Sequence, residues 1–490
     1  MIACGQGLNE EQRGAVFSEI DPQTPILVLA GAGCGKTTVL THRIIHIAGH
    51  YCRPDQILAL TFTRKAAEEM SERVAALLSS AEQRSRPLIT TFHGFGLRIL
   101  KDTVEGVPNY SRLGYTAEPA LLSAKEKIEY LVRATTKSER QNYKKDVLAL
   151  DALIEKTSVS EGGLETMDAA LQSWIRGVVD RVNAMKRQNG AWEFADMIRG
   201  AIKLLQEHEA IARVYRQRFR AVLVDEFQDT NPLQLDLLKL MLSTKASLFV
   251  VGDDDQAIYG FRGADITPTL HFGDYFPGAR ILKLQTNYRS STKILQTANR
   301  IFKAKAKAYR KVLQSGLALD SAFASSPAPR IVKLTDEEEK NTFVLKEIRK
   351  LQDHYHLAPQ ECALLFRLNQ TLDTTRSELH DRLDTDVAFL TIHASKGLEF
   401  PAVFLCDLEE GVFPHVPELL NKPKSAQSVL LKWLTQRTNE LVNETLAEEK
   451  RLFYVGVTRA KHALYLISVR EKMLHARTCR LFPSRFLKLI

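Results

Sequence analysis

A glycine-rich segment with one lysine and two threonines near the start of the chain has the composition of a phosphate-binding loop. Residues 30–38 read AGAGCGKTT and fit the pattern G-x-x-x-x-G-K-[ST] if Ala30 fills the first glycine position. In such a loop the backbone N–H groups face phosphate oxygens, Lys36 reaches the β- and γ-phosphates, and Thr37 ligates Mg²⁺. The predicted nucleotide-binding residues are Ala30, Gly31, Ala32, Gly33, Cys34, Gly35, Lys36, Thr37 and Thr38. We interpret Cys34 as a small filler rather than a nucleophile.

Two adjacent carboxylates, Asp225 and Glu226, follow a second apolar run, AVLV. Such a pair is often only the solvated end of a strand. Together with the glycine-rich loop it suggests catalysis, because Asp225 would hold Mg²⁺ and Glu226 would orient and deprotonate an attacking water. The two motifs predict a nucleoside triphosphatase and leave open how the energy is used.

Short apolar runs alternate with helical patterns, which is typical of an α/β fold with parallel sheets. We predict a first α/β core from residues 1–100 and 211–278, interrupted by a charged, helical insertion at 101–210. A second α/β core is predicted from 279 to 490, beginning with RILKLQTNYRS and containing the strand candidates RIVKL, CALLFR, VAFLTIH, PAVFLCDL and HALYLIS. Residues 320–330 have the composition of a linker.

The composition limits the class of protein. The 490 residues are 44% hydrophobic and 26% charged, which is typical of a soluble, multidomain protein. The net charge of +9 favours a polyanionic partner. Six scattered cysteines argue against a metal cluster or disulfide framework, and we find neither a signal peptide nor a membrane-spanning run. We therefore expect a cytoplasmic protein.

Further motifs occur in one order along the chain: LNEEQ, TFTRKAAEEM, TFHGF, VDEFQDTN, VGDDDQAIYGFRGA, NYRS, LTIHASKGLEF and EEKRLFYVGVTRAKHALYL. This ordered set resembles the UvrD/Rep/PcrA family of superfamily 1A DNA helicases, and it covers both ends of the chain. The resemblance implies two RecA-like P-loop cores, with a helical insertion in the first core and a reduced or absent one in the second.

The resemblance also implies roles around the nucleotide, which would be ATP with Mg²⁺. Gln12 would read the adenine edge, and Gln256 would touch the γ-phosphate. Arg289 and Arg459 would be arginine fingers from the second core, because charge spreading over the transferred phosphoryl group needs cations on several sides. Glu399 and Arg73 would also lie near the nucleotide. The implied catalytic residues are Lys36, Asp225, Glu226, Gln256, Arg289 and Arg459, and the implied metal ligands are Thr37 and Asp225.

For single-stranded DNA, the resemblance implies phosphate contacts and bases stacked on aromatic rings. The predicted contacts are Phe62, Thr91, His93, Tyr259, Phe261, Arg262 and His393. We expect the four aromatic residues Phe62, His93, Tyr259 and Phe261 in loops after strands. Phe261 stands where the family often has Trp, and His393 also suits a core position.

The chain departs from the family pattern in its second core. Arg289 and Lys396 lie only 107 positions apart, which leaves little room for the family's second accessory subdomain. The segment 414–446, with Trp433, is interpreted as a small cap or a surface loop and helix. The compact form also resembles the helicase-like subunit of Gabija antiphage systems, which works with a nuclease.

Two functions are carried forward. The first is an ATP-dependent single-stranded DNA translocase or helicase, moving 3′ to 5′ by family analogy. The second is a nucleic-acid-sensing ATPase subunit that regulates a partner nuclease. A helicase–nuclease fusion is set aside because about twenty residues follow the last motif, fewer than a domain needs. The residues leave open DNA versus RNA, and repair, replication or antiphage defence.

Overall fold

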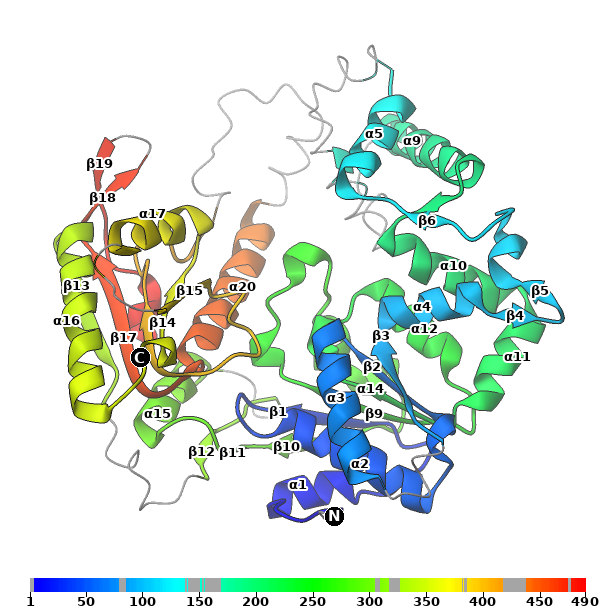
Figure 1. Ribbon diagram of the computed structural model, residues 1–490, viewed down its shortest axis with the longest axis horizontal. Helices are drawn as coiled ribbons and strands as arrows, with labels where there is room; N and C mark the ends of the chain where they lie inside the picture. Colours follow the sequence, from blue (N-terminus) through cyan, green and yellow to red (C-terminus); the bar gives the residue numbers. More distant parts are fainter. Residues whose placement is uncertain are drawn as a thin grey trace.

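The computed structural model describes residues 4–78, 85–136, 139, 150–151, 154, 169–304, 309–316, 327–380, 382, 386–416, 438–474 and 477–490. Most of the predicted linker at 320–330 and of the segment at 414–446, including Trp433, lies outside these residues. Within the described part of the chain no helix is long and apolar enough to cross a bilayer. Two parallel sheets, each covered by helices, lie side by side (Figure 1).

The first core contains a six-stranded parallel sheet in the order β10-β1-β9-β8-β2-β3. Its strands are β1 (Ile26–Ala30), β2 (Ile57–Thr61), β3 (Leu88–Thr91), β8 (Ala221–Val224), β9 (Ser247–Gly252) and β10 (Arg280–Leu284). The inner strands β1, β9, β8 and β2 are buried along their whole length. Burial on both faces explains why they form nearly continuous apolar runs in the sequence.

The strand β10 corrects the predicted boundary between the cores. The sequence pattern predicts that the second core begins at residue 279, but Arg280–Leu284 pairs in parallel with all five residues of β1. The backbone groups of β1 need partners on both sides, and β10 provides them on one side. The next sheet begins only at β13 (Arg330–Leu334), after the short pair β11 (Thr286–Asn287) and β12 (Gln314–Ser315).

Alternate side chains of β1 divide the first core into two apolar layers. Ile26 and Val28 pack with one group of helices, whereas Leu27 and Leu29 pack with another. The first group is α1 (Glu10–Val16), α2 (Lys36–His50) and α3 (Arg64–Leu77), and the second is α4 (Phe92–Lys101), α10 (Phe194–Glu207), α11 (Glu209–Arg218) and α12 (Pro232–Met241). The short helices α13 (Thr267–Leu270) and α14 (Phe272–Tyr275) follow β9.

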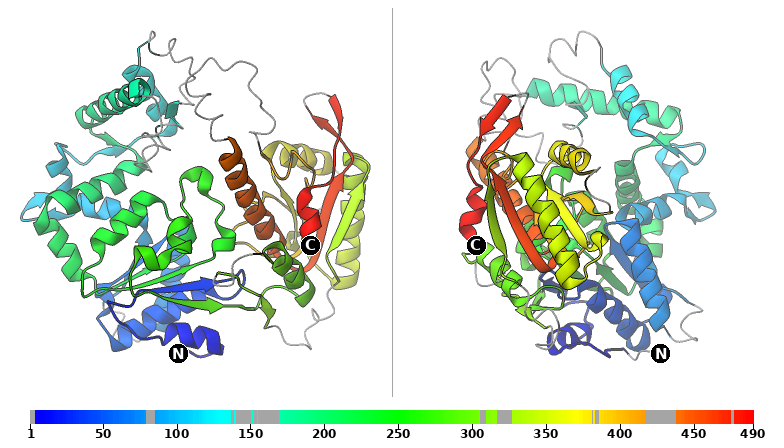
Figure 2. Two further views of the ribbon diagram at one scale, coloured as in Figure 1. Left: turned by 180° about the vertical axis from the view of Figure 1, so that it is seen from behind. Right: turned by 60° about the vertical axis from the view of Figure 1, so that its left-hand side comes forward.

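The helical insertion stands apart from both sheets (Figures 1 and 2). Its described helices, α5 (Ala124–Ala134) and α9 (Ala169–Gln188), share a small apolar cluster around Leu131 and Val178. Next to them β6 (Ala120–Leu121) pairs with β7 (Ala191–Trp192), whereas the pair β4 (Thr103–Val104) and β5 (Val107–Pro108) lies beside α4 and α11 (Figure 1). The predicted insertion at 101–210 also contained α10, whose buried side chains instead belong to the apolar layer of the first core.

The second core contains a five-stranded parallel sheet in the order β13-β17-β16-β14-β15. Besides β13, its strands are β14 (Cys362–Phe366), β15 (Ala388–Thr391), β16 (Phe400–Leu405) and β17 (Ala460–Val469). Its helices are α15 (Thr292–Ile301), α16 (Glu337–Tyr355), α17 (Asn369–His380) and α20 (Thr438–Val457), and a hairpin of β18 (Glu471–Leu474) and β19 (Arg477–Arg480) follows. Residues 381–387 alone connect α17 to β15, which confirms the predicted reduction of the second insertion.

Candidate nucleotide and nucleic-acid site

The glycine-rich loop joins β1 to α2, as predicted. Gly33 and Gly35 have φ angles of 67° and 80°, a region that favours glycine. A Cβ on Gly33 would also meet Asn287 Nδ2 at 2.6 Å, and one on Gly35 would meet Gln12 Nε2 at 2.7 Å. Lys36 is the first residue of α2, so the loop lies at the positive end of a helix, where anions bind favourably.

Asp225 and Glu226 follow β8 directly and lie beside the loop. Glu226 has a φ of 50°, and its Oε1 lies 3.1 Å from Lys36 Nζ. Burial and then the neighbouring Glu226 raise the pKa of Asp225 to about 7. Burial opposes ionisation of Glu226 too, but Lys36 and Lys396 outweigh it and lower the pKa of Glu226 to about 2.

These charges fit a divalent cation next to Asp225. Its side chain is buried and its nearest charged neighbour in sequence is another carboxylate, which a cation would offset. Thr37, in the first turn of α2, can provide a hydroxyl ligand. Cys34 is buried, and burial raises its pKa to about 12, so it stays a thiol, as expected of a filler.

The second core places Arg459 against the first. Arg459 is buried and its Nη2 donates to Gln256 Oε1 at 3.3 Å, while Gln256 Nε2 donates to Asp253 Oδ2 at 2.5 Å. The same guanidinium donates to the carbonyls of Leu398 and Val455. Burial and then Arg289 lower the pKa of Arg459 to about 9. A continuous polar chain therefore runs from the second core to the end of β9.

Arg289 and Glu399 form a second contact at the cleft. Arg289 Nε donates to Glu399 Oε2 at 2.6 Å, and Lys461 Nζ lies 2.7 Å from the other carboxylate oxygen. A Cβ on Gly33 would meet Arg289 Cβ at 2.7 Å, and the N–H of Tyr288 donates to the carbonyl of Gly33 at 3.0 Å, so this segment lies directly against the phosphate loop. The structure therefore brings both predicted arginine fingers and Glu399 together where the two cores meet.

Gln12 and Arg73, the remaining predicted nucleotide contacts, differ in placement. Gln12 is buried in a capping box with Asn9, and its Nε2 donates to the carbonyl of Cys34 in the loop at 3.1 Å. Arg73 lies in α3, with its Nη2 4.0 Å from Glu69. Gln12 is therefore positioned at the loop, whereas a place for Arg73 at the nucleotide stays a prediction.

Lys311 is a buried cation that the sequence analysis missed. Its Nζ lies 3.0 Å from Asp253 and 2.9 Å from Asp255, and it is also paired with Asp254. Three successive aspartates place three negative charges in one buried turn, which is unfavourable without a cation nearby. This run of aspartates was the only sign in the sequence that a cation would lie there. The oxygens of these aspartates are close enough to hold a metal ion, but an ammonium group already lies among them.

The turn after β9 is also held by the second core. Arg451 Nε, from α20, donates to the carbonyl of Ala257 at 2.6 Å, and Glu448 accepts from the N–H of Gly260 at 3.0 Å. Lys396 Nζ contacts Asp229 Oδ2 at 2.5 Å and the carbonyl of Gln256 at 3.0 Å. None of these three second-core residues was predicted as part of the site.

Aromatic side chains gather directly after this turn. The rings of Phe62 and Tyr259 stack with centroids 5.1 Å apart, and Phe261 lies 6.1 Å from Tyr259. Phe261 is 64% exposed. Tyr259 immediately precedes the short 3₁₀ helix Gly260–Arg262, and Phe261 lies within it.

Arg262 and His393 surround Phe261. The Arg262 guanidinium lies 5.4 Å from the ring centroid of Phe261 and 5.3 Å from that of Tyr259, and His393 meets Phe261 edge-on at 5.4 Å. Burial, then Arg367, Arg262 and Lys396, lower the pKa of His393 to about 4. His393 is therefore a neutral hydrogen-bonding group at the edge of a cationic, aromatic surface.

His93 corrects one expectation, because it lies in the first turn of α4 rather than in a loop. Thr91 is the N-cap of this helix, and its Oγ1 accepts from the N–H of Gly94 at 3.0 Å. Phe194, which the sequence analysis did not select, packs edge-on against His93 at 5.9 Å and is 51% exposed. Phe194 is the first residue of α10, and neither this position nor its exposure could be read from the sequence.

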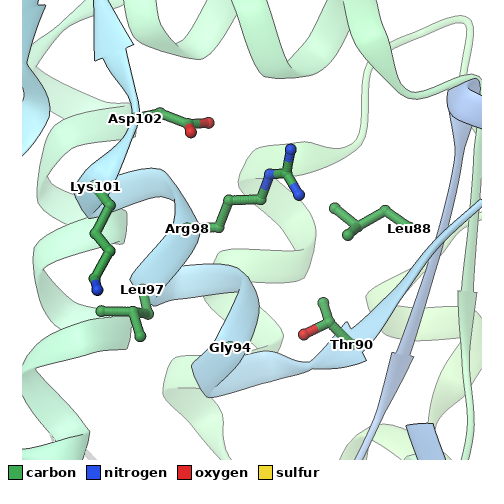
Figure 3. A pocket seen from close by; sticks show the side chains of 7 residues that line it. All are labelled: Leu88, Thr90, Gly94, Leu97, Arg98, Lys101 and Asp102. Atoms are coloured by element: carbon green, nitrogen blue, oxygen red, sulfur yellow. The ribbon is translucent and has the colours of Figure 1, made fainter. Parts of the chain in front are cut away.

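A cavity of about 310 Å³ borders α4 and the edge strand β3 (Figure 3). It is lined by Leu88, Thr90, Gly94, Leu97, Arg98, Lys101 and Asp102. Lys101 is paired with Glu118, and Asp102 accepts a hydrogen bond from Tyr215. Because two of its three charged groups are paired within the protein, we assign this cavity no ligand.

Comparison with known protein families identifies both cores. Residues 8–277 match the UvrD/REP helicase N-terminal domain. Residues 282–383 and 371–471 match the UvrD-like helicase C-terminal domain. These matches span most of the chain and agree with two RecA-like cores.

Individual relatives agree with this assignment. The chain is 31% identical to a probable DNA helicase of Mycoplasma pneumoniae over 99% of its own length and 87% of the relative. It is 34% identical to the ATP-dependent DNA helicase Rep of Escherichia coli over 70% of the chain, and 33% identical to the ATP-dependent DNA helicase PcrA of Leuconostoc citreum over 74%. It spans only about half the length of the Rep and PcrA proteins. The chain belongs to the UvrD-like family of DNA helicases.

Proposed function

We propose that this UvrD-like chain hydrolyses ATP between its two cores and uses each cycle to move along single-stranded DNA. One observation supports the coupling most directly. Gln256, which Arg459 contacts, lies only three residues before Tyr259 and five before Phe261. A change at the nucleotide therefore has a short, buried route to the proposed stacking surface.

In the proposed mechanism the phosphate loop binds the triphosphate, and Lys36 exchanges its contact with Glu226 for phosphate oxygens. Mg²⁺, held by Thr37 and Asp225, would offset phosphate charge when bound. Release from Lys36 leaves Glu226 free to orient the attacking water and accept its proton. Arg289 and Arg459 stabilise the charge that develops on the transferred group.

Movement would follow from opening and closing of the cleft. ATP draws the second core toward the loop through Arg289 and Arg459, and product release lets it withdraw. The contacts of Glu448, Arg451 and Lys396 transmit this motion to the turn at 256–262, so the grip on stacked bases alternates. We propose 3′-to-5′ movement, in agreement with the family resemblance.

Replacement of Lys36 by Ala or of Glu226 by Gln tests the proposed activity. Hydrolysis of ATP by the wild-type chain should rise strongly when single-stranded DNA is added, and both variants should lose this hydrolysis while still binding DNA. ATP hydrolysis that is not stimulated by DNA would contradict the proposed motor. ATP hydrolysis that continues in the Glu226→Gln variant would contradict it as well. Displacement of strands from substrates with 3′ or 5′ tails then measures polarity.

The reduced connection between α17 and β15 favours a second candidate, an ATPase subunit that responds to nucleic acid and regulates a nuclease. It predicts ATP hydrolysis without strand displacement until the partner is present. Co-purification of a nuclease with the tagged chain from its own cells, followed by a nuclease assay with ATP, distinguishes this function from an independent helicase.

A further inference from the structure

Gln228 is a buried side chain beside the proposed catalytic carboxylate, and the proposed mechanism leaves it without a role. It lies in the short 3₁₀ helix Phe227–Asp229 that follows Glu226, and it is 0% exposed. A buried glutamine amide is unfavourable unless its N–H donors and its carbonyl acceptor find partners. The partners of Gln228 therefore show which groups this side chain can hold in place.

The amide nitrogen of Gln228 faces the carboxylate that we propose to orient the attacking water. Its Nε2 donates to Glu226 Oε2, and it also donates to Asp229 Oδ2 at 3.3 Å. The other carboxylate oxygen of Glu226, Oε1, lies 3.1 Å from Lys36 Nζ. Lys36 and Gln228 therefore both hold the carboxylate of Glu226.

The amide oxygen of Gln228 is fixed by the strand β9. Its Oε1 accepts from the N–H of Asp253, the residue directly after β9, at 2.8 Å. Gly252 permits this approach, because a Cβ there would meet Gln228 Oε1 at 2.8 Å. A reversed amide would direct its oxygen at two carboxylates and its N–H groups at a backbone N–H, which is unfavourable. The surroundings therefore specify the orientation in which the nitrogen faces Glu226.

Two roles are open to a buried amide in this place. In the first role, Gln228 only joins its 3₁₀ helix to the backbone of Asp253. In the second role, it also fixes the direction of the Glu226 carboxylate. The second role is favoured because, in the proposed mechanism, Lys36 leaves Glu226 for phosphate oxygens. The hydrogen bond from Gln228 remains after this step, and it keeps the carboxylate aligned when alignment matters most.

We propose that Gln228 is a positioning residue for ATP hydrolysis, which holds the carboxylate of Glu226 toward the attacking water after Lys36 has moved to the phosphates. This inference rests on the proposed function. Gln228 acts through Glu226 and is not itself catalytic. Its anchor, Asp253, also accepts a hydrogen bond from Gln256 Nε2, so one residue connects the positioning amide with the proposed γ-phosphate contact.

Three replacements of Gln228 test the proposal in the full chain, by steady-state ATP hydrolysis with saturating single-stranded DNA. Gln228→Met loses the donors and the acceptor. Gln228→Glu keeps the acceptor for the N–H of Asp253 but loses the donors, and Gln228→Asn keeps both on a side chain one methylene shorter. Each replacement should lower kcat at least about tenfold, because misalignment of a reacting group costs up to about a hundredfold.

Binding of ATP should be nearly unchanged in these variants, because none of them alters the phosphate loop. The KM for ATP and the affinity for a non-hydrolysable ATP analogue should each change by less than about threefold. A loss in kcat that is shared by Gln228→Met and Gln228→Glu is explained by what the two variants have in common, the missing donors to Glu226.

Gln234→Met is the matched control. Gln234 is also a buried glutamine, and it caps α12 by accepting from the N–H of Asn231 at 3.1 Å. The control therefore removes a buried amide of the same kind outside the nucleotide site, and it should hydrolyse ATP like wild type. Circular dichroism and thermal unfolding check that each variant is folded.

Three outcomes overturn the proposal. The first is a wild-type kcat in Gln228→Met, or in Gln228→Asn if the methionine variant does not fold. The second is a wild-type kcat in Gln228→Glu, because the contact with Asp253 alone would then be sufficient. The third is a parallel loss of hydrolysis and of analogue binding, which would show a purely structural role.

The wild-type chain and Glu226→Gln, assayed beside these variants, separate this inference from the proposed function. If DNA does not stimulate the wild type, or if Glu226→Gln still hydrolyses ATP, the proposed function fails and the role of Gln228 fails with it. If both behave as proposed, normal hydrolysis in the Gln228 variants contradicts only the role of Gln228.

Discussion

Neighbouring charges decide which groups of the nucleotide site are ionised. Lys36 and Lys396 keep Glu226 ionised, whereas burial makes a proton on Asp225 favourable. The same competition between burial and charge occurs around Lys311, where burial opposes the ammonium but Asp253, Asp255 and Asp254 raise its pKa well above the usual value. The charged side chains of this site therefore have two roles. They keep their neighbours in a defined ionisation state, and some of them also take part in the proposed chemistry.

Replacement of Lys311 by Met should destabilise the fold. Removing one partner of a buried ion pair leaves uncompensated charge and costs about 3–5 kcal/mol of the free energy of unfolding. Urea denaturation measures this loss, and Lys303→Met, at an exposed position nearby, should change the free energy by less than about 0.5 kcal/mol. Adding Asp254→Asn to Lys311→Met should recover part of the loss. If Lys311→Met and Lys303→Met changed the free energy of unfolding equally, the pairing of Lys311 with the three aspartates would contribute nothing to stability.

Replacement of His393 by Gln should alter the pH dependence of stability. The pKa of His393 is about 4 in the folded chain and about 6.5 when unfolded, so the unfolded chain binds more protons between these values. The stability that the neutral ring provides is present above pH 6.5 and is lost as the pH falls toward 4. The melting temperature of the wild-type chain should therefore fall more between pH 6.5 and pH 4 than that of the His393→Gln variant.

The affinity for single-stranded DNA is a second, independent test of the ionisation state of His393. His393 stays neutral at pH 6 and at pH 8, so His393→Gln should change the affinity by the same factor at both. A factor that grows on acidification would mean that the charged ring contacts DNA.

At the scale of elements, the turn between β9 and α13 is held by several contacts from the second core. It contains Gln256, a proposed nucleotide contact, and then Tyr259 and Phe261, which we propose to stack on bases. The helix α20 holds it through Arg451 and Glu448. The helix belongs to the second core and the turn to the first. In the proposed mechanism, these hydrogen bonds to the backbone of the turn transmit relative motion of the cores to the aromatic residues.

Replacement of Glu448 by Ala should weaken this coupling. It removes the acceptor for the N–H of Gly260, so we expect DNA to stimulate ATP hydrolysis less, by about 5- to 10-fold, because one charge-assisted hydrogen bond is lost. Hydrolysis without DNA should change little. Glu444→Ala, one turn earlier on an exposed part of α20, is the control and should behave as wild type. A parallel loss of both activities would instead point to a general structural defect.

At the scale of the whole molecule, the proposed active site exists only where two cores meet. The first core provides the phosphate loop, Asp225 and Glu226, and the second provides Arg459. One apolar cluster also includes buried residues of both cores, such as Val39 and Leu405. Binding of the nucleotide should therefore depend mainly on one core, whereas hydrolysis should require both.

Replacement of Arg459 by Lys should separate the two steps. The change keeps the charge but loses the planar fork that reaches Gln256, so kcat should fall by about a thousandfold, as for loss of an arginine finger. Binding of a fluorescent, non-hydrolysable ATP analogue should change by only a few-fold, with circular dichroism to check folding. Equal losses of binding and hydrolysis would mean that Arg459 has a structural role rather than a catalytic one.

The sequence by itself determined the motifs and elements that are formed by neighbouring residues. Contiguous signals predicted the phosphate loop, the carboxylates Asp225 and Glu226, most strands and the two-core fold, because strand–loop–helix geometry is set by residues close in the chain. Pairings between distant segments were decided only by the tertiary structure. They include β10 joining β1, Lys311 entering three aspartates, and α20 gripping the turn at 256–262. Each depends on which buried charges and backbone groups find partners after the sheets assemble, and patterns of neighbouring residues do not reveal this.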